Sequence, residues 1–251
     1  MTLETEIEKV IIRTVLHVML PLGSKAASSQ AQETANQILY KLLTPAPGKT
    51  EPEISANDAR RMLGDILAQM DYEPAPGKED TIQDLLSDAR LDLIILTAVY
   101  LVFGYKRWRG RQEPTYLHDW PCFEFYRAFR RENQRNWPER WKAAGGLFFP
   151  GEPSHREGRM IALRDDPIWI TISAFGLPFP PFDFNSGMMT KPVSREEAVE
   201  LGVIQIDHTI QPAALSASDE FQERLAAKLH ENLAKLEADE ERRMSDRSDA
   251  H

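Results

Sequence analysis

Apolar residues recur every three or four positions through the first hundred residues, which is the spacing of one face of an α-helix. One such stretch covers residues 7–19 and another covers residues 28–43. A third helix is expected to begin at Ser55 or Asn57, because both side chains cap helix N-termini well. A fourth helix is expected over about residues 81–105. Its second half is apolar on almost every side, which indicates a helix in the middle of the core.

The pattern changes in the middle of the chain. Phe123 and Phe125 alternate with polar neighbours, which favours a strand over residues 121–129. A short helical segment is then expected to end at Gly145 and Gly146. A second short strand is expected just before an Asp-Asp-Pro turn.

Two further helices are predicted near the C-terminus. Ser194 and Glu197 have the spacing of a capping box, so a short helix is expected to run from Ser194 through Leu201. A long helix is expected from Asp219, and its charged end from residue 237 is expected to fray. The long helix has one apolar stripe, made of Phe221, Leu225, Leu229, Leu233 and Leu236.

These patterns predict an α+β protein with a helical N-terminal half, a small irregular β-containing module and a C-terminal helix. The expected division assigns residues 1–80 to the helical N-terminal region and residues 81–210 to the module. Residues 211–251 hold the C-terminal helix and its charged tail.

Charge is unevenly distributed along the 251 residues. The chain is 42% hydrophobic and 27% charged, which is ordinary for a globular protein. Its net charge of −9 argues against nucleic-acid binding through the overall field. Residues 106–142 are the exception, because they include ten basic and five acidic side chains and so carry +5. The rest of the chain carries −14, so we expect an electrostatically polarised surface.

Cofactor and membrane binding find little support in the sequence. Cys122 is the only cysteine, which excludes an intrachain disulfide and a cysteine-based zinc site. The six histidines are scattered without ligand spacing, so no cofactor and no metal is expected. Acids near the N-terminus argue against a signal peptide. The longest apolar run, residues 91–103, is too short for a membrane span, so no membrane partner is expected.

Two features invite a catalytic interpretation. Asp165 and Asp166 are paired carboxylates, but Asp-Asp-Pro is a common turn sequence and no third ligand follows at a suitable spacing. Ser186 lacks the glycines of a nucleophile elbow. Asn-Ser-Gly fits a tight turn in which Gly187 takes a positive φ. We therefore predict no catalytic residue.

The basic segment 106–142 also contains four tryptophans. Arginines interleaved with aromatic side chains bind nucleic-acid backbone and bases, and they are also enriched in protein–protein interfaces. No nucleic-acid-binding module is recognisable, so a protein interface is favoured and DNA contact is the alternative. The candidate interface residues are Arg107, Trp108, Arg109, Arg130, Arg131, Trp137 and Trp141.

The stretch FPPFDFNSGMM at residues 179–189 places two prolines among three phenylalanines. Proline fixes φ and keeps the chain extended, so the aromatic side chains can pack onto the strand and the tryptophan beneath. We interpret this stretch, together with that tryptophan, as a structural clasp. Its residues are Trp169, Pro180, Pro181, Phe182, Asn185 and Gly187.

The order of these segments resembles the phage Mu protein F-like minor head proteins, a family of phage head morphogenesis proteins. The resemblance covers about residues 85–204 and rests on the ordered series rather than on one element. The series consists of the helix ARLDLIILTAVYLVFGYKRW, the strand PCFEFYRAF, the segment RWKAAGG, the turn DDPIW, the Pro-Pro loop and the segment KPVSREEAVELGV.

Two elements of that family differ here. Family members often have His-x-x-Leu-x-Gly where this chain has WKAAGG at residues 141–146. They often have Asn-Cys-Arg-Cys after the prolines, where this chain has NSGM at residues 185–188. Both differences remove potential metal ligands, so the resemblance implies a shared scaffold and carries over no metal or disulfide role.

The resemblance implies a non-enzymatic minor head protein of a tailed phage or prophage. Such a protein would lie in the virion, and in the host cytoplasm during assembly. Its expected partners are portal, capsid or scaffold subunits. One alternative is a DNA-contacting protein at the portal that uses the basic segment 106–142, and another is a small hydrolase of unknown substrate.

Overall fold

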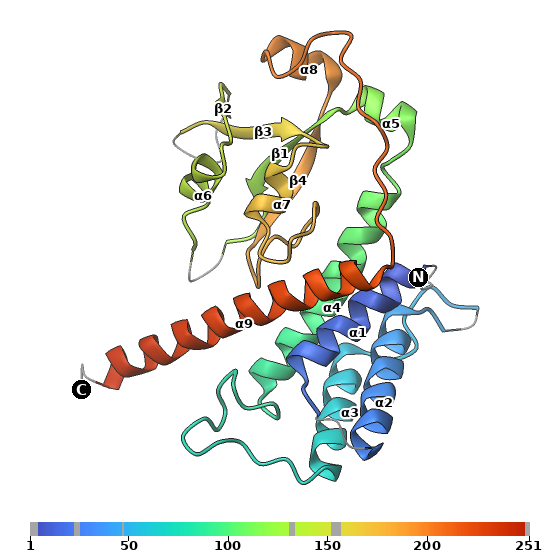
Figure 1. Cartoon of the computed structure of the whole chain (residues 1–251), viewed down its shortest axis with the longest axis vertical. Coiled ribbons are helices and arrows are strands. Elements are labelled where there is room, and N and C mark those ends of the chain that lie inside the picture. Colours follow the sequence, from blue (N-terminus) through green and yellow to red (C-terminus); the bar gives the residue numbers. More distant parts are fainter. Residues whose placement is uncertain (1–4, 23–25, 47, 131–133, 152–156, 249–251) are drawn as a thin grey trace. The chain divides into compact units, whose positions relative to one another are not determined.

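The computed structural model describes residues 5–22, 26–46, 48–130, 134–151 and 157–248. The protein is mixed α+β, with N-terminal helices and a long C-terminal helix, as predicted (Figure 1). The predicted β-containing module in the middle is a small four-stranded antiparallel sheet. The chain forms two compact units. Residues 1–102 and 216–251 make up the helical unit, and residues 103–215 make up the sheet unit.

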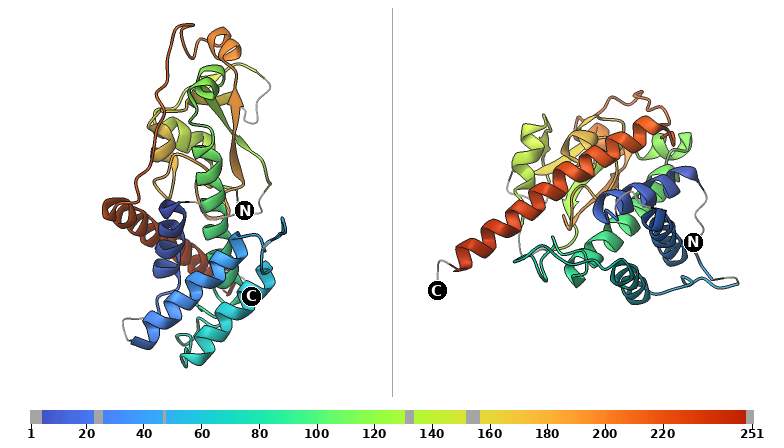
Figure 2. Two further views of the ribbon diagram at one scale, coloured as in Figure 1. Left: turned by 90° about the vertical axis from the view of Figure 1, so that its right-hand side faces the viewer. Right: turned by 60° about the horizontal axis from the view of Figure 1, so that its bottom comes forward.

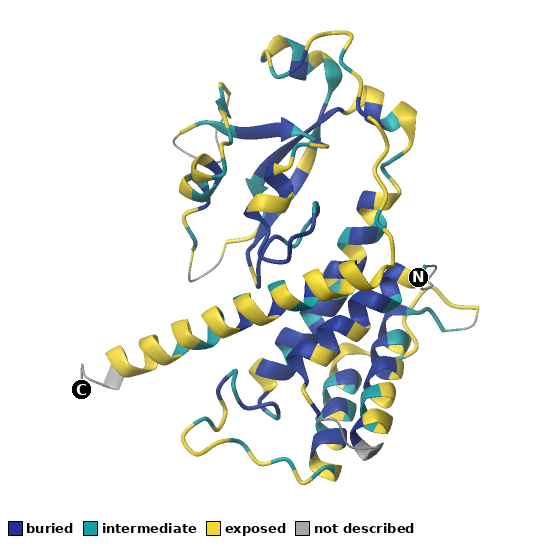
Figure 3. Cartoon of the chain, in the orientation of Figure 1, coloured by how far each residue is buried: buried dark blue, intermediate teal, exposed yellow. Residues whose placement is uncertain are grey.

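Apolar stripes at helical spacing build the helical unit. Within it, α9 lies across α1 (Figures 1 and 2). The predicted stripe of α9 is buried at Phe221, Leu225, Leu229 and Leu233, whereas the far part of this helix is mostly exposed (Figure 3). The helices are α1 (Glu6–Met19), α2 (Ala26–Leu43), α3 (Ala56–Gln69), the part of α4 (Asp88–Arg109) up to residue 102, and α9 (Asp219–Ser248).

Helix α3 begins with the cap that the sequence predicted. The Ser55 hydroxyl accepts a hydrogen bond from the Asp58 N–H at 3.1 Å, and the Asp58 carboxylate accepts one from the Ser55 N–H at 3.3 Å. This reciprocal capping box satisfies two N–H groups that have no partner inside the helix. The helix start is therefore set locally.

Helix α4 begins at Asp88, so the prediction that it starts near residue 81 is wrong. The Asp84 carboxylate accepts hydrogen bonds from the N–H groups of Asp80 and Leu86, and the Ser87 hydroxyl donates to the carbonyl of Thr81. Short polar side chains of this kind compete with helix formation by bonding the nearby backbone. Ser87 then caps α4 by accepting from the Arg90 N–H at 3.1 Å.

The charged end of α9 is helical through Ser248, so the prediction that it frays is wrong for these residues. Its acids contact α4 and the chain between α3 and α4. Glu237 pairs with Arg90 at 2.9 Å, and Glu240 accepts from the Ile82 N–H at 3.0 Å. Glu241 pairs with Lys78. These long-range contacts hold the helix, and the sequence pattern alone did not indicate them.

The sheet has the strand order β2-β3-β1-β4, and all neighbouring strands are antiparallel. On β1, one of the two inner strands, Phe123 lies opposite Ala162 on one side and Pro192 on the other. The short helices of the sheet unit are α5 (Pro114–Asp119), α6 (Trp137–Ala143), α7 (Ile168–Ile172) and α8 (Arg195–Glu200). The strands are β1 (Cys122–Arg127), β2 (Phe148–Phe149), β3 (Arg159–Leu163) and β4 (Met188–Val193).

Strand β4 was not predicted. No strand was expected between the Asn-Ser-Gly turn and the helix at Ser194, whereas residues 188–193 pair along the whole of β1. The sequence MMTKPV has little strand character, and Pro192 cannot donate a ladder hydrogen bond. Proline is tolerated here because β4 is an edge strand.

The two faces of the sheet are both covered. Phe123 and Phe125 point to the face that packs against α6 and α7, whereas Cys122 points to the face that packs against Ala198 of α8. This division follows from the alternation of side chains along a strand. The Ser194 hydroxyl caps α8 by accepting from the Glu197 N–H at 3.2 Å, as predicted.

The burial of Cys122 has a measurable chemical consequence. Burial, with a smaller contribution from Asp165, raises the pKa of the Cys122 thiol to about 12. Because the thiolate is the reactive form, alkylation by iodoacetamide at pH 8 should be about a thousandfold slower in the folded protein than in urea. Mass spectrometry over time would measure both rates. Similar rates in the two states would contradict the buried position of Cys122.

Within the described residues, no helix combines the length and the apolar character that crossing a membrane requires.

Candidate functional site

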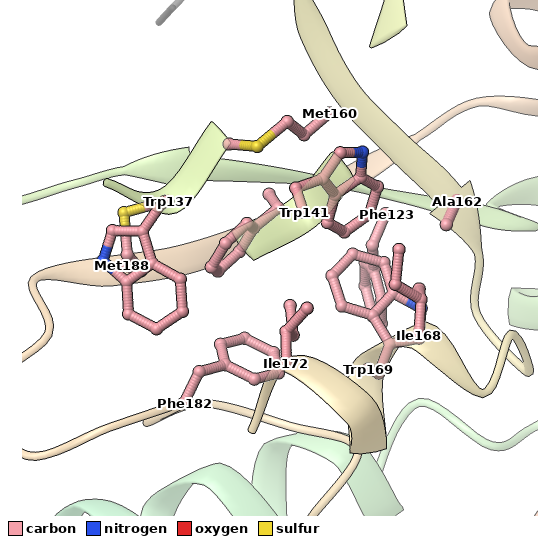
Figure 4. Close-up of a cluster of buried hydrophobic side chains, with 11 residues drawn as sticks. Phe123, Trp137, Trp141, Met160, Ala162, Ile168, Trp169, Ile172, Phe182 and Met188 are labelled. Carbon is pink, nitrogen blue, oxygen red and sulfur yellow. The ribbon is translucent and has the colours of Figure 1, made fainter. Parts of the chain in front are cut away.

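An aromatic cluster fills the space between one face of the sheet and helices α6 and α7 (Figure 4). Trp169 of α7 lies with its ring centroid 5.4 Å from that of Trp141 on α6. Phe125 of β1 meets Trp137 edge-on at 5.3 Å and Phe182 edge-on at 5.1 Å. All five side chains are fully buried. Segments that are far apart in the sequence therefore share one core.

The tryptophans of the candidate interface are core residues. Trp137 and Trp141 have no exposed surface, and Trp108 is 6% exposed. The expectation that these three side chains form part of a surface is therefore wrong for this structure. Burial of large aromatic side chains beside other rings is strongly favourable, whereas arginines can keep their charged groups in water.

The Pro-Pro loop packs on this cluster. The Pro180–Pro181 peptide bond is cis, and Phe182 lies on Trp169 with a ring distance of 5.9 Å. The Phe182 carbonyl accepts a hydrogen bond from the Ala174 N–H at 2.7 Å. A side chain at Gly104 would lie 1.8 Å from the Pro180 carbonyl oxygen, so glycine allows the loop to approach this part of α4.

The other two phenylalanines of the loop differ from the prediction that they pack onto the strand and Trp169. Phe179 packs between Tyr105 and Trp108, at ring distances of 6.1 and 5.8 Å. Phe184 packs edge-on against Phe175 at 5.0 Å. The loop therefore contacts three separate aromatic groups.

The Asn-Ser-Gly turn leads directly into β4. Asn185 and Gly187 both take positive φ values, 48° and 68°. The Ser186 hydroxyl accepts a hydrogen bond from the Met188 N–H at 3.3 Å. The Gly187 carbonyl accepts from the N–H groups of residues 128 and 129, which follow β1. The hydroxyl of Ser186 thus stabilises the turn.

Asp183 links the loop to two arginines, and the sequence analysis did not single it out. Its carboxylate lies 3.0 Å from Arg135 and 2.9 Å from Arg140. The Arg140 guanidinium also lies over the Trp137 ring, 4.4 Å from its centroid. An acid inside an otherwise aromatic loop was the available signal, because a buried carboxylate needs a cationic partner.

The exposed basic residues of the candidate interface are Arg107, Arg109 and Arg130. Arg107 and Arg130 form no ion pair with any described residue. Arg131 lies outside the described residues. The basic character of this segment therefore reaches the surface through arginines, while its tryptophans lie in the core.

A charged network lies on the opposite face of the sheet from the aromatic cluster. Glu124 is 1% exposed and binds Arg159 through two hydrogen bonds of 2.8 and 2.6 Å. Lys191 of β4 lies 3.1 Å from the same carboxylate, and Arg159 also pairs with Glu197 of α8 at 2.7 Å. The network joins β1, β3, β4 and α8, and its charges are mutually paired.

The predicted Asp-Asp-Pro turn is present. The Asp166 carboxylate accepts a hydrogen bond from the Ile168 N–H at 2.8 Å at the start of α7. Asp165 is exposed. In the part of the chain that the structure describes, no three His, Cys, Asp or Glu side chains gather in a way that would hold a metal ion.

Comparison with known proteins returned no matching family model, no matching curated protein and no matching solved structure.

Proposed function

We propose that this chain is a non-enzymatic minor head protein of a tailed phage or prophage, held in the particle by portal, capsid or scaffold subunits. One observation carries the proposal. Four of the six segments whose order resembles the Mu F-like minor head proteins pack together, since Phe125 of the strand, Trp141 of the short helix, Trp169 of the turn and Phe182 of the Pro-Pro loop share one core. These four segments therefore form a single packed scaffold.

The use of polar side chains in this scaffold supports a non-catalytic role. Ser186 accepts a hydrogen bond inside its turn, and Asp166 accepts one from the Ile168 N–H at the start of α7. Two of the three groups that invited a catalytic interpretation thus have a structural partner.

The proposal is tested by asking whether the chain is part of the particle. Particles induced from the host genome are purified on a density gradient, and a tagged chromosomal copy is followed by immunoblotting. Co-sedimentation of the chain with DNA-filled particles supports the proposal. Recovery of the chain only in the particle-free fractions contradicts it.

Charge reversal at Arg130 should weaken incorporation without unfolding the protein. Arg130 is exposed and forms no ion pair with the described residues, so Arg130→Glu should change the free energy of unfolding by less than about 0.5 kcal/mol. Complementary charge sets approach and register between protein partners, so particle recovery should fall several-fold. Melting temperature and immunoblotting of purified particles measure the two effects.

Lys49→Glu is the matched control, because Lys49 is an exposed cation in the loop between α2 and α3 and the change in charge is the same. Equal loss of incorporation in both variants would mean that net charge, rather than Arg130, controls assembly. A strong, salt-dependent affinity for DNA that Arg130→Glu abolishes would favour the DNA-contacting alternative.

A further inference from the structure

Two arginine side chains stack on one tyrosine in the sheet unit. Arg111 follows α4, Tyr116 lies on α5 and Arg164 follows β3. The guanidinium carbons of Arg164 and Arg111 lie 4.9 and 5.6 Å from the centroid of the Tyr116 ring. Arg164 also lies 4.4 Å from the Phe123 ring. The Arg164 residue is only 5% exposed, whereas Arg111 and Tyr116 are half-buried.

This cluster has no acidic partner in the described chain. Arg164 donates to the Arg111 carbonyl at 2.9 Å and, weakly, to the Trp120 carbonyl at 3.5 Å. Its Nε is buried and meets no acceptor. Neither Arg111 nor Arg164 forms an ion pair with a described carboxylate. Two guanidinium groups therefore share one ring without a counter-charge.

Among the described residues, Arg90 and Arg159 are covered arginines that each have an acidic partner. Arg90 is 3% exposed and lies 2.9 Å from Glu237. The largely buried Arg159 side chain lies 2.6 Å from Glu124. A buried charge is costly unless an opposite charge accompanies it, so Arg164 carries a cost that Arg90 and Arg159 do not.

The electrostatics of the cluster favour the binding of an anion. Burial is the main cause that lowers the pKa of Arg164 to about 10; Tyr116 opposes this shift, and Arg111 adds to it. Burial also lowers the pKa of Arg111, and the nearby Arg107 contributes in the same direction. Both guanidinium groups would be stabilised by a negative group beside them.

We propose that Arg111 and the exposed Arg107, with Arg164 behind them, bind a carboxylate of a partner protein. Arg107 lies four residues before Arg111, near the end of α4. An arginine fork holds a carboxylate through two parallel hydrogen bonds. The Tyr116 hydroxyl forms no hydrogen bond to a described residue, so it is free to donate to the same anion. The identity of the partner as an assembly subunit rests on the proposed function.

A protein carboxylate fits this site better than a nucleic-acid phosphate. The chain has a net charge of −9, and the residues outside 106–142 carry −14, so a long polyanion meets repulsion beyond the immediate cluster. A short acidic segment meets only the local positive charge. Arginine and tyrosine are also the residue types that contribute most to protein–protein binding.

The test uses the full chain and a fluorescein-labelled peptide of alternating glutamate and glycine as the probe. Fluorescence anisotropy should show binding that Arg111→Gln and Arg107→Gln each weaken by about tenfold. Lys142→Gln is the matched control, because it removes an exposed cation of the same unit outside the cluster, and it should leave affinity within about twofold. Arg111→Lys should give an intermediate affinity, since it keeps the charge and loses the fork.

Three results would overturn the proposal: an equal loss in Lys142→Gln, no effect of Arg111→Gln, or Arg111-dependent binding of an oligonucleotide that is tighter than binding of the peptide. Tryptophan fluorescence checks that each variant is folded.

The particle experiment tests the proposed function separately. If the chain is in particles but Arg111→Gln changes neither peptide binding nor recovery, the carboxylate site fails and the proposed function stands. If peptide binding depends on Arg111 but the chain is absent from particles, the site stands and the proposed function fails.

Discussion

Replacing Trp169 with alanine should lower the free energy of unfolding of the sheet unit by about 3–5 kcal/mol. Trp169 has no exposed surface, and its ring lies within 6.2 Å of the ring centroids of Phe123, Phe125, Trp141 and Phe182. Its indole N–H also donates to the Leu163 carbonyl at 2.6 Å. Truncation removes all of these contacts and leaves a cavity that the sheet and its helices cannot fill without moving.

Tryptophan fluorescence measures this effect selectively, because all five tryptophans lie between residues 103 and 215. Urea titration followed by fluorescence therefore reports on the sheet unit. Ile170→Ala is the matched control, since Ile170 is the next residue of α7 and is 50% exposed. It should cost less than about 1 kcal/mol. Equal effects of the two substitutions would show that Trp169 is not part of a packed core.

Replacing Arg90 with methionine should lower the free energy of unfolding of the helical unit by about 3 kcal/mol. Arg90 is 3% exposed, and it donates to the Met19 carbonyl at 3.0 Å, to the Ile82 carbonyl at 3.1 Å and to Glu237 at 2.9 Å. It therefore joins α1, α4 and α9. Methionine fills part of the volume but leaves Glu237 and two carbonyl groups without their donor.

Circular dichroism at 222 nm follows this loss, because most of the helix lies in the helical unit. Arg61→Met is the matched control. Arg61 is an exposed arginine of α3 whose ion pairs with Asp58 and Asp65 are 3.6 and 3.7 Å long, so its loss should cost no more than about 1 kcal/mol.

Adding Glu237→Gln to Arg90→Met should recover part of the stability, since it removes the unpaired carboxylate. If the double variant is destabilised by the full sum of the two single effects, Arg90 and Glu237 are not coupled.

Some contacts of the clasp residues could be predicted from the sequence, and others could not. The positive φ of Gly187 and the contact of Phe182 with Trp169 were both predicted, because Asn-Ser-Gly and Pro-Pro restrict the backbone locally. The ion pairs of Asp183 were not predicted. Arg140 lies 43 residues earlier in the chain, and no local rule connects the two.

The arginine- and tryptophan-rich segment was misread for a related reason. Composition marks such a segment as a candidate surface, but it does not say which side chains are covered. Trp137 and Trp141 are buried because β1, α7 and the Pro-Pro loop supply rings to pack against. The same fold leaves Arg107 and Arg130 exposed and places Arg164 in the core without an acid.

Local sequence determined where most helices and turns occur, because apolar spacing, N-caps and glycine turns act over only a few residues. It did so for the Ser55 and Ser194 caps and for the apolar stripe of α9. Long-range packing decided the rest. Strand β4 exists because β1 supplies its hydrogen-bonding partner, and the end of α9 holds its place through Glu237, which meets Arg90 across 147 residues of sequence. Pairing of this kind depends on three-dimensional proximity, which hydrophobic periodicity does not encode.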